Sequence, residues 1–410
     1  MCFHNMHCIA QLKIQFMPNS IIKYCFANCP ESCKFRKSNA ICGDKKAVIY
    51  ALCKGLTRIF ISRSQPFGKS YLISVYKEFF ETGTCDYFGL DIDKRRIDRP
   101  YPVVRLDFSF CKHQKTIENF RAVFNTFITS AFSPLGFKFD PTHASIRFID
   151  QLKYWLNTLE PNSIVLLIDD YDVLLTTHLD DPELFNQVSR VLGEFYAAIK
   201  ECEGCLRFLF ITGETRIGFD GIFGGFNIFE DITFDPDYGT LFGFTADEIE
   251  SNFRDDLKNA EAVLNLSRKD LLNEMRRHYG GFSFDSEAET HIFCPSSVLQ
   301  FLSHPEKGFQ PYWHASEGER SELWNFIKSK ALSSPDIFKA RTSITMDELE
   351  GFSSGQNISL KALLVQTGCL TIKSKLNMAE VELGCPNKEV EHFLEQLCAE
   401  EKLKRGSPMH

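Results

Sequence analysis

The stretch that most constrains this 410-residue chain is residues 57–72, TRIFISRSQPFGKSYL. Its apolar run at 58–62 is typical of a buried strand, and a loop that ends in Gly68 follows. Lys69 and Ser70 then open a segment with the apolar spacing of a helix. Strand, Gly-Lys-Ser and helix together predict a phosphate-binding loop, in which N–H groups at the helix N-terminus face an anion. Lys69 would add a point charge, and the Ser70 hydroxyl would ligate Mg²⁺.

A second element supports this loop about a hundred residues later in the chain. Arg63 stands where the usual loop pattern has its first glycine, and Gly-Lys-Ser alone is common by chance. The apolar run 165–168, however, delivers Asp169 and Asp170 to the end of a parallel strand. In P-loop enzymes such a carboxylate helps to hold Mg²⁺, and the adjacent acid orients the attacking water. Capping of a turn is the alternative interpretation for these aspartates.

Further candidates follow the other strands. The apolar run 207–212 ends in Thr212, whose hydroxyl could bridge the attacking water and the γ-phosphate. Arg216 is a candidate for stabilising charge in the transition state, in cis or toward a neighbour, and a solvated loop arginine is the alternative. Arg105 and Asp107, on the second strand, are interpreted as structural residues that pair with one another or with flanking loops.

Strand and helix patterns alternate through residue 234, which predicts a doubly wound α/β domain with ligands at the carboxyl ends of its strands. The strands are expected at 58–62, 103–108, 163–169, 207–212 and 231–234. From Thr245 onward the pattern is mainly helical, and Thr245 with Glu248 has the spacing of a capping box. A hairpin is expected within 370–383, and a charged helix at 387–403.

Composition narrows the class of protein. The net charge of −8 gives no independent support to nucleic-acid binding. The sequence has no apolar run of membrane-spanning length and no secretory signal at its start, which favours a cytoplasmic protein. Seven of the 15 cysteines fall in the first 53 residues, with a C-x3-C-x3-C-x8-C spacing at 25–42 that is not a familiar zinc pattern. Reduced thiols and a metal site are the two alternatives for them.

Several motifs in the same order resemble the predicted AAA-ATPase-like domain of bacterial ATP-binding proteins. The matching segments are SRSQPFGKS, YPVVRLDFS, IVLLIDDYDVLL, TGETRIGFDGIFGGFNIFEDITFDP, HYGGFSF and VQTGCLTIKS. The resemblance implies a P-loop NTPase fold and ATP with Mg²⁺ as cofactors. It also implies nucleotide contacts from the loop residues Arg63, Phe67, Gly68, Lys69 and Ser70. Ser70 and Asp169 would hold the metal, with Asp170, Thr212 and Arg216 at the reaction centre.

The resemblance divides the chain into four parts: a Cys-rich leader at 1–44, a P-loop core at 45–243, an α-rich lid at 244–383 and a terminal helix at 384–410. Gln65 and Pro66 replace two arginines of the family loop, and Asp170 replaces a glutamate. Many relatives continue into a PD-(D/E)XK nuclease-like domain. No strand-borne D…ExK arrangement follows the junction here, so nuclease activity is not expected.

Three functional hypotheses result. The first is a Mg²⁺-dependent ATPase that couples hydrolysis to movement of the lid. The second is a nucleotide-binding switch or scaffold with impaired hydrolysis, since a shorter carboxylate at Asp170 would misplace the water by roughly 1 Å. The third, a nucleic-acid-associated motor, is suggested only by the nuclease domain of relatives. Self-association or a protein partner is compatible with each of the three.

Overall fold

The structure is a computed structural model. It describes residues 45–83, 99–142, 146–223, 229–313, 322–331, 341–351 and 359–396. The predicted Cys-rich leader at 1–44 lies outside these ranges, as do residues 84–98 and the last part of the predicted terminal helix.

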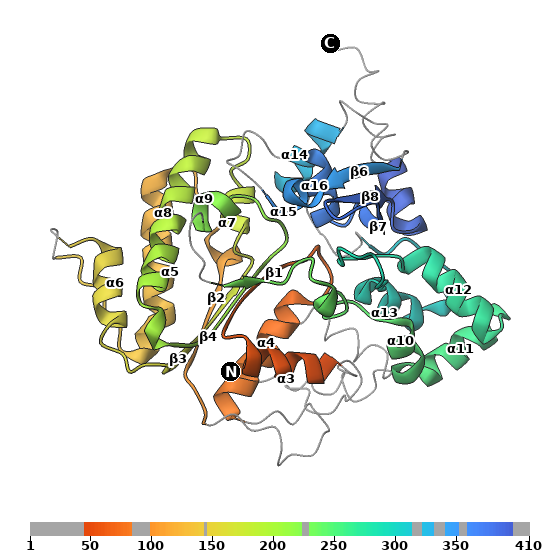
Figure 1. The fold of residues 1–410 in the computed structure, drawn as a ribbon, viewed down its shortest axis with the longest axis horizontal. Helices are drawn as coiled ribbons and strands as arrows, with labels where there is room; N and C mark the ends of the chain where they lie inside the picture. Colours follow the sequence, from red (N-terminus) through yellow and green to blue (C-terminus); the bar gives the residue numbers. More distant parts are fainter. Residues whose placement is uncertain are drawn as a thin grey trace, which may run out of the picture.

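A parallel sheet forms the centre of the molecule (Figure 1). Its strands are β1 (Arg58–Ser62), β2 (Val103–Asp107), β3 (Ile164–Asp169), β4 (Leu206–Gly213) and β5 (Glu230–Asp231). They lie in the order β2-β3-β4-β1-β5, and every neighbouring pair is parallel. This confirms the doubly wound α/β prediction. β5 is shorter than expected, and it begins one residue earlier than predicted.

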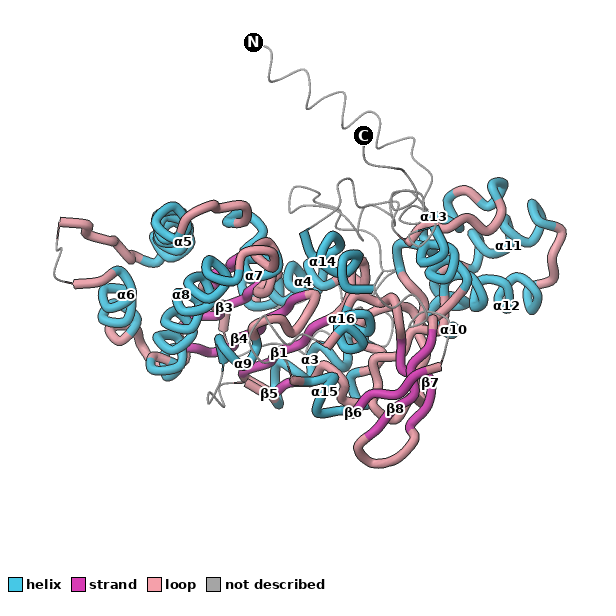
Figure 2. The backbone as a smooth tube through the Cα atoms, turned by 90° about the horizontal axis from the view of Figure 1, so that it is seen from above, coloured by secondary structure: helices cyan, strands magenta, loops and turns pink. Residues whose placement is uncertain are grey.

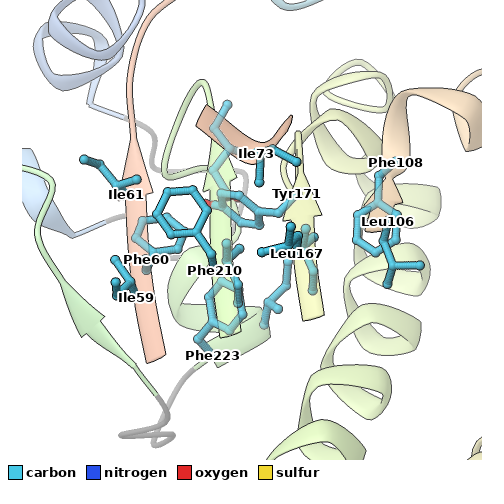
Figure 3. Close-up of a cluster of buried hydrophobic side chains, with 14 of the residues drawn as sticks. Ile59, Phe60, Ile61, Ile73, Leu106, Phe108, Leu167, Tyr171, Phe210 and Phe223 are labelled. Carbon is cyan, nitrogen blue, oxygen red and sulfur yellow. Dashed lines mark hydrogen bonds between the residues drawn. The ribbon is translucent and has the colours of Figure 1, made fainter. Parts of the chain in front are cut away.

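The strands form because their apolar runs are covered on both faces. All six residues of β3 are buried, as are seven of the eight in β4. Aromatic rings fill the space beside them, where Phe60 contacts Tyr171 with centroids 5.2 Å apart and Phe223 at 6.0 Å (Figure 3). Burial of one such side chain contributes roughly 1.5–3 kcal/mol. This core fixes the strands and therefore the positions of their carboxyl ends.

Helices cover both faces of the sheet (Figure 1). On one face lie α3 (Lys45–Gly55) and α4 (Lys69–Thr82); on the other lie α5 (Ile117–Phe132), α6 (Phe148–Leu156) and α8 (Pro182–Glu201). The short helices α7 (Val173–Thr176) and α9 (Phe219–Phe223) follow β3 and β4. In α5 an apolar stripe recurs every four residues and is buried, at Phe120, Phe124, Ile128 and Phe132. Within the described ranges, no helix has both the length and the hydrophobicity needed to cross a membrane.

The second half of the chain contributes to two hydrophobic cores. A separate core lies among α10 (Ala246–Asn252), α11 (Arg254–Leu264), α12 (Arg268–Tyr279) and α13 (Pro295–Ser303). The predicted capping box is present at the start of α10, with Thr245 and Glu248 bonded reciprocally. Buried residues between 313 and 394 instead join the core of the central sheet. The predicted lid region, 244–383, therefore spans two packing units.

An antiparallel sheet completes the C-terminal part (Figure 2). Its strands are β6 (Thr342–Thr345), β7 (Thr371–Lys375) and β8 (Glu380–Gly384), and its neighbouring helices are α14 (Glu322–Ala331), α15 (Met346–Glu350) and α16 (Leu360–Gln366). β7 and β8 form the hairpin that the sequence predicts. β6, which the sequence analysis missed, pairs with β8 across roughly forty residues of chain, and no local pattern reveals such a partner. Residues 388–396 are helical, as predicted.

Candidate nucleotide-binding site

The loop between β1 and α4 has the geometry of a phosphate-binding loop. α4 begins at Lys69, and Gly68 precedes it with φ 96° and ψ 25°, in the left-handed region. A β-carbon built on Gly68 would meet no atom within 4 Å, so the backbone conformation and not packing favours glycine there. The first N–H groups of a helix have no partner within the helix and attract an anion. The first turn of α4 therefore fits phosphate oxygens.

The Lys69 ammonium is held inside the loop. The residue is only 5% exposed, and its Nζ donates a 2.8 Å hydrogen bond to the carbonyl oxygen of Arg63. Its charge also lowers the pKa of the neighbouring carboxyls of Asp169 and Asp170, against the larger effect of burial. Lys69 thus lies between the loop backbone and the strand-end carboxylates. A phosphate group in the loop would compete with the Arg63 carbonyl for its protons.

Asp169 ends β3 beside the start of α4. It is 1% exposed, and neither of its carboxylate oxygens has a hydrogen-bond partner among the described residues. Burial raises the pKa of Asp169, while the nearby Ser70 hydroxyl and the Lys69 ammonium lower it. A buried carboxylate without a hydrogen-bond donor is costly, and a bound cation would add to the compensation that the Arg105 guanidinium supplies from 3.6 Å. The unsatisfied oxygens of Asp169 are the observation that most directly indicates a cation site.

The donors at this place suit Mg²⁺ bound together with phosphate. Mg²⁺ usually keeps several waters and takes one or two carboxylates plus substrate phosphate oxygens. Ser70 and Asp169 provide one hydroxyl and one carboxylate. In the part of the chain that the structure describes, no group of three or more His, Cys, Asp or Glu side chains is arranged to hold a metal ion. The residues present therefore fit a metal that arrives with its nucleotide.

Asp170 follows in an unusual backbone conformation. Its φ of 50° lies in the left-handed region, which Asp and Asn tolerate better than most residues. Burial and the negative charge of Asp169 raise the pKa of Asp170 to about 7. A cation between the two carboxylates would reverse this effect, because it favours their charged forms. Asp170 thus combines a left-handed backbone conformation with a carboxyl group whose pKa lies near neutral pH.

Arg105 contacts the same aspartate from the neighbouring strand. Its Nη2 lies 3.6 Å from Oδ2 of Asp169 and 4.0 Å from Oδ2 of Asp107. The pairing of Arg105 with Asp107 agrees with the sequence analysis, whereas its contact with Asp169 was not foreseen. The contact follows from register, because Asp107 lies directly opposite Asp169 in the β2–β3 pair. Arg105 therefore supplies positive charge to the proposed metal carboxylate.

Thr212 lies in the same row across the sheet. Ile168 pairs with Ile211, so the register places Asp169 beside Thr212 on the next strand. Thr212 is fully buried, and its hydroxyl has no hydrogen-bond partner among the described residues. In the part of the chain that the structure describes, two neighbouring strand ends therefore carry buried polar groups that lack hydrogen-bond partners. This arrangement agrees with a site for a polar ligand at the carboxyl edge of the sheet.

Asp172 is a residue of this region that the sequence analysis missed. Its Oδ1 accepts a 3.1 Å hydrogen bond from the N–H of Glu214. Its Oδ2 accepts hydrogen bonds from the N–H and the hydroxyl of Thr215, at 2.7 and 2.6 Å. Asp172 therefore ties the turn after β3 to the turn after β4. In the sequence, Asp172 is visible only as a third acidic residue, three positions beyond Asp169. The residues that it binds are more than forty positions later in the chain, so the sequence does not reveal them.

Arg216 is held by the protein itself. The residue is 4% exposed; its guanidinium pairs with Asp231 and donates to the carbonyl of Glu350. It also lies over the ring of Phe219, 4.1 Å from its centroid, and its N–H donates to Oε1 of Gln366. In this arrangement Arg216 joins the central sheet to the C-terminal part. Its predicted role at the reaction centre stays a prediction that would require these contacts to open.

Two further loop residues are also buried. Arg63, which is 1% exposed, donates to the carbonyls of Ser62 and Thr233 and lies over the ring of Phe284 at 4.7 Å. Burial lowers the pKa of Arg63 to about 9. Phe67, 2% exposed, contacts Phe284 edge to face with centroids 5.2 Å apart. Both side chains connect the loop to the second half of the chain, and their predicted contact with nucleotide stays a prediction.

A parallel sheet in this order, with Gly-Lys-Ser after β1 and a buried aspartate at the end of β3, defines a P-loop NTPase-like core. Residues 32–223 match the model of the family described as Predicted AAA-ATPase. The family suggests a nucleotide-binding, ATPase-like role for the region.

One curated relative is similar over a longer stretch. It is described as "Uncharacterized protein in vnfD 5'region" from Azotobacter chroococcum mcd 1, and it is 25% identical over 359 residues. The alignment covers 86% of this chain and 65% of that protein. The similarity therefore continues beyond the family match at 32–223. The chain thus spans less than two thirds of the length of that relative.

Proposed function

We propose that this chain binds ATP with Mg²⁺ at the loop between β1 and α4 and hydrolyses it. The observation that carries the proposal is Asp169, a buried carboxylate that lies beside Lys69 and Ser70 and whose oxygens receive no well-formed hydrogen bond from the described residues. A strand-end carboxylate, a loop lysine and a hydroxyl at a helix start are the three groups that P-loop enzymes use around nucleotide and metal. The family match of residues 32–223 supports ATP as the nucleotide.

Each residue then has a defined task. The N–H groups of the first turn of α4 and the Lys69 ammonium bind phosphate oxygens, and Ser70 with Asp169 hold Mg²⁺. When bound, Mg²⁺ neutralises charge on the terminal phosphates. Asp170 orients the attacking water and accepts its proton, and Thr212 is placed in the same row to donate to the γ-phosphate or water. The positive charge of Arg105 favours the ionised form of Asp169, against the larger effect of burial on its pKa.

A second candidate is a nucleotide-binding switch with slow or no hydrolysis. Two observations favour it. The pKa of Asp170 is raised to about 7, so a sizeable fraction of this carboxyl is protonated at neutral pH in the absence of a cation. Arg216 is occupied by Asp231 and Glu350 and is not free to reach a phosphate in this arrangement. In that case nucleotide binding would change the conformation of the C-terminal part without turnover.

Phosphate release distinguishes the two candidates. Purified protein is incubated with ATP and Mg²⁺, beside Lys69→Ala and a control variant, Lys258→Ala, whose lysine is 72% exposed on α11. The ATPase predicts steady release that falls by roughly a hundredfold or more in Lys69→Ala and is unchanged in Lys258→Ala. If the protein binds ATP but shows no phosphate release that depends on Lys69, the switch is favoured. Release equal in all three proteins would exclude this site as its source.

A further inference from the structure

The segment 386–393, which we call the C-terminal hook, is connected to the phosphate-binding loop through two separate series of contacts, or routes. It begins after β8 and enters the terminal helix. Glu389 anchors it, and this residue is 2% exposed. Its Oε1 accepts a 2.7 Å hydrogen bond from the Ser297 hydroxyl of α13. Its Oε2 accepts the N–H groups of Tyr312 and Trp313, both at 3.1 Å.

The first route passes through Trp313 and Gly368. A β-carbon built on Gly368 would lie 3.0 Å from Cζ2 of Trp313 and 3.1 Å from Oγ of Ser64, and its φ of 80° favours glycine. Gly368 is therefore packed between the tryptophan that Glu389 holds and the start of the phosphate-binding loop. Ser64 is fully buried, and its hydroxyl has no hydrogen-bond partner within the described ranges.

The second route passes through the turn after α12. Asn387 Nδ2 donates a 2.8 Å hydrogen bond to the carbonyl of Gly280. A β-carbon on Gly281 would lie 2.5 Å from the carbonyl oxygen of Pro386, so the turn and the hook are in close contact. The next residue, Phe282, packs edge to face against Phe67 with centroids 5.0 Å apart. Phe67 immediately precedes Gly68, whose left-handed backbone starts α4.

Aromatic rings hold the hook at its other end. Phe393 lies 5.5 Å from the ring of Trp313 and 5.4 Å from that of Trp324. The hook therefore has a polar anchor at Glu389 and an apolar anchor at Phe393, and Trp313 contacts both. Both ends of the loop, Ser64 and Phe67, rest on residues that the hook holds in place. A shift of the hook would remove support from the loop at two points.

We propose that docking of the C-terminal hook is coupled to nucleotide occupancy of the phosphate-binding loop, so that the hook is a regulatory element of this site. The docked hook favours nucleotide binding because it supports the loop through Trp313 and Phe282. By linkage, bound nucleotide stabilises the docked hook by the same factor. This inference rests on the proposed nucleotide binding and goes beyond it, since none of the hook residues belongs to the nucleotide site itself.

The test measures nucleotide affinity and hook docking in the same full-length chain. Glu389→Leu keeps a side chain of similar size but removes both acceptor oxygens, so the Ser297 hydroxyl and the N–H groups of Tyr312 and Trp313 lose this partner. With fluorescently labelled ADP and Mg²⁺, we expect the dissociation constant to rise at least about fivefold. Glu248→Leu is the matched control, because Glu248 is a buried carboxylate in the capping box of α10 that accepts the N–H of Thr245 and pairs with Lys45, and it is not part of the hook. It should leave the affinity unchanged.

Hydrogen exchange gives the reciprocal measurement. In the wild-type chain, nucleotide should slow amide exchange at residues 387–393, because it stabilises the docked hook. An unchanged dissociation constant in Glu389→Leu, or exchange in the hook that does not respond to nucleotide, overturns the coupling. If Glu389→Leu does not fold, Phe393→Leu removes only the ring contacts with Trp313 and Trp324 and carries the same expectation. If the wild-type chain binds no nucleotide, both the proposed function and the coupling are overturned. The titration of the wild-type chain alone distinguishes this outcome from a failure of the coupling.

Discussion

The ammonium of Lys69 donates a 2.8 Å hydrogen bond to the carbonyl oxygen of Arg63, six residues earlier in the same loop. The lysine side chain thus links the start of the loop to its end. This bond keeps a buried cation satisfied and at the same time holds the loop backbone near the start of α4. Nucleotide phosphate offers a stronger, charge-assisted acceptor at the same place. Binding would therefore exchange one partner of Lys69 for another without a large rearrangement of the side chain.

Gly68→Ala tests the backbone conformation at the helix start. The built β-carbon meets nothing within 4 Å, so the whole cost comes from φ 96°. We expect the free energy of unfolding to fall by about 1–2 kcal/mol, measured by chemical denaturation. Gly55→Ala is the control, since Gly55 ends α3, has open space around it and has no left-handed φ. Equal effects of the two substitutions would contradict a left-handed Gly68.

Phe67→Ala tests the packing of the loop against the second half of the chain. Phe67 is 2% exposed and contacts Phe282 and Phe284. Its truncation should lower the free energy of unfolding by roughly 3–5 kcal/mol. Phe110 is 76% exposed, and Phe110→Ala should change stability by less than about 0.5 kcal/mol. A small effect of Phe67→Ala in thermal and chemical unfolding would mean that this ring is not part of the core.

Asp172→Asn tests the connection between the turns after β3 and β4. The aspartate accepts hydrogen bonds from two backbone N–H groups and the Thr215 hydroxyl, and an amide group has only one acceptor oxygen. The unsatisfied donors should cost roughly 1–3 kcal/mol of unfolding free energy. Asp181→Asn should be nearly neutral, because Asp181 accepts a single N–H at the start of α8 and Asn caps helices equally well. If both variants are neutral, Asp172 does not hold these turns together.

Asp170→Asn tests the raised pKa of this carboxyl. The pKa of Asp170 lies near 7 in the folded chain and near the ordinary value of about 3.9 when unfolded. At pH values between these two pKa values, the folded state therefore binds more protons than the unfolded state. The free energy of unfolding of the wild-type chain decreases as pH rises through this window. The amide does not titrate and tolerates the left-handed backbone. Without nucleotide or Mg²⁺, the stability of the variant relative to wild type should increase by roughly 1–3 kcal/mol from pH 5 to pH 8. A pH-independent difference would show that Asp170 is ionised throughout.

The sequence predicts the parts of the site that depend on local pattern. Lys69 and Ser70 follow an apolar strand run, and Asp169 ends another, so their placement follows from strand direction alone. The contact of Arg105 with Asp169 depends on the register between strands that are some sixty residues apart, and the sequence does not specify that register. The burial of Arg216 likewise depends on Glu350 and Gln366, which belong to a part of the chain with no repeated pattern.

The second half of the chain was predicted less completely for the same reason. Its helices α10–α13 have clear apolar spacing and caps, as at Thr245. β6 is only four residues long, TSIT, and is recognisable as a strand only beside β8. The close approach of Gly368 to Ser64 joins residues about three hundred positions apart, and a lone glycine in a sequence gives no sign of what it touches. Such contacts are visible only once the chain is folded.

The most direct test of nucleotide binding is a calorimetric titration of the full-length chain with ATP, with and without Mg²⁺, beside Lys69→Ala and Asp169→Asn. The wild-type chain should bind one equivalent of ATP, more tightly with Mg²⁺ than without it. Lys69→Ala should lose most of the affinity under both conditions, whereas Asp169→Asn should lose mainly the increment due to Mg²⁺. Absence of saturable binding by the wild-type chain, or binding that neither substitution changes, would contradict a nucleotide site at this loop.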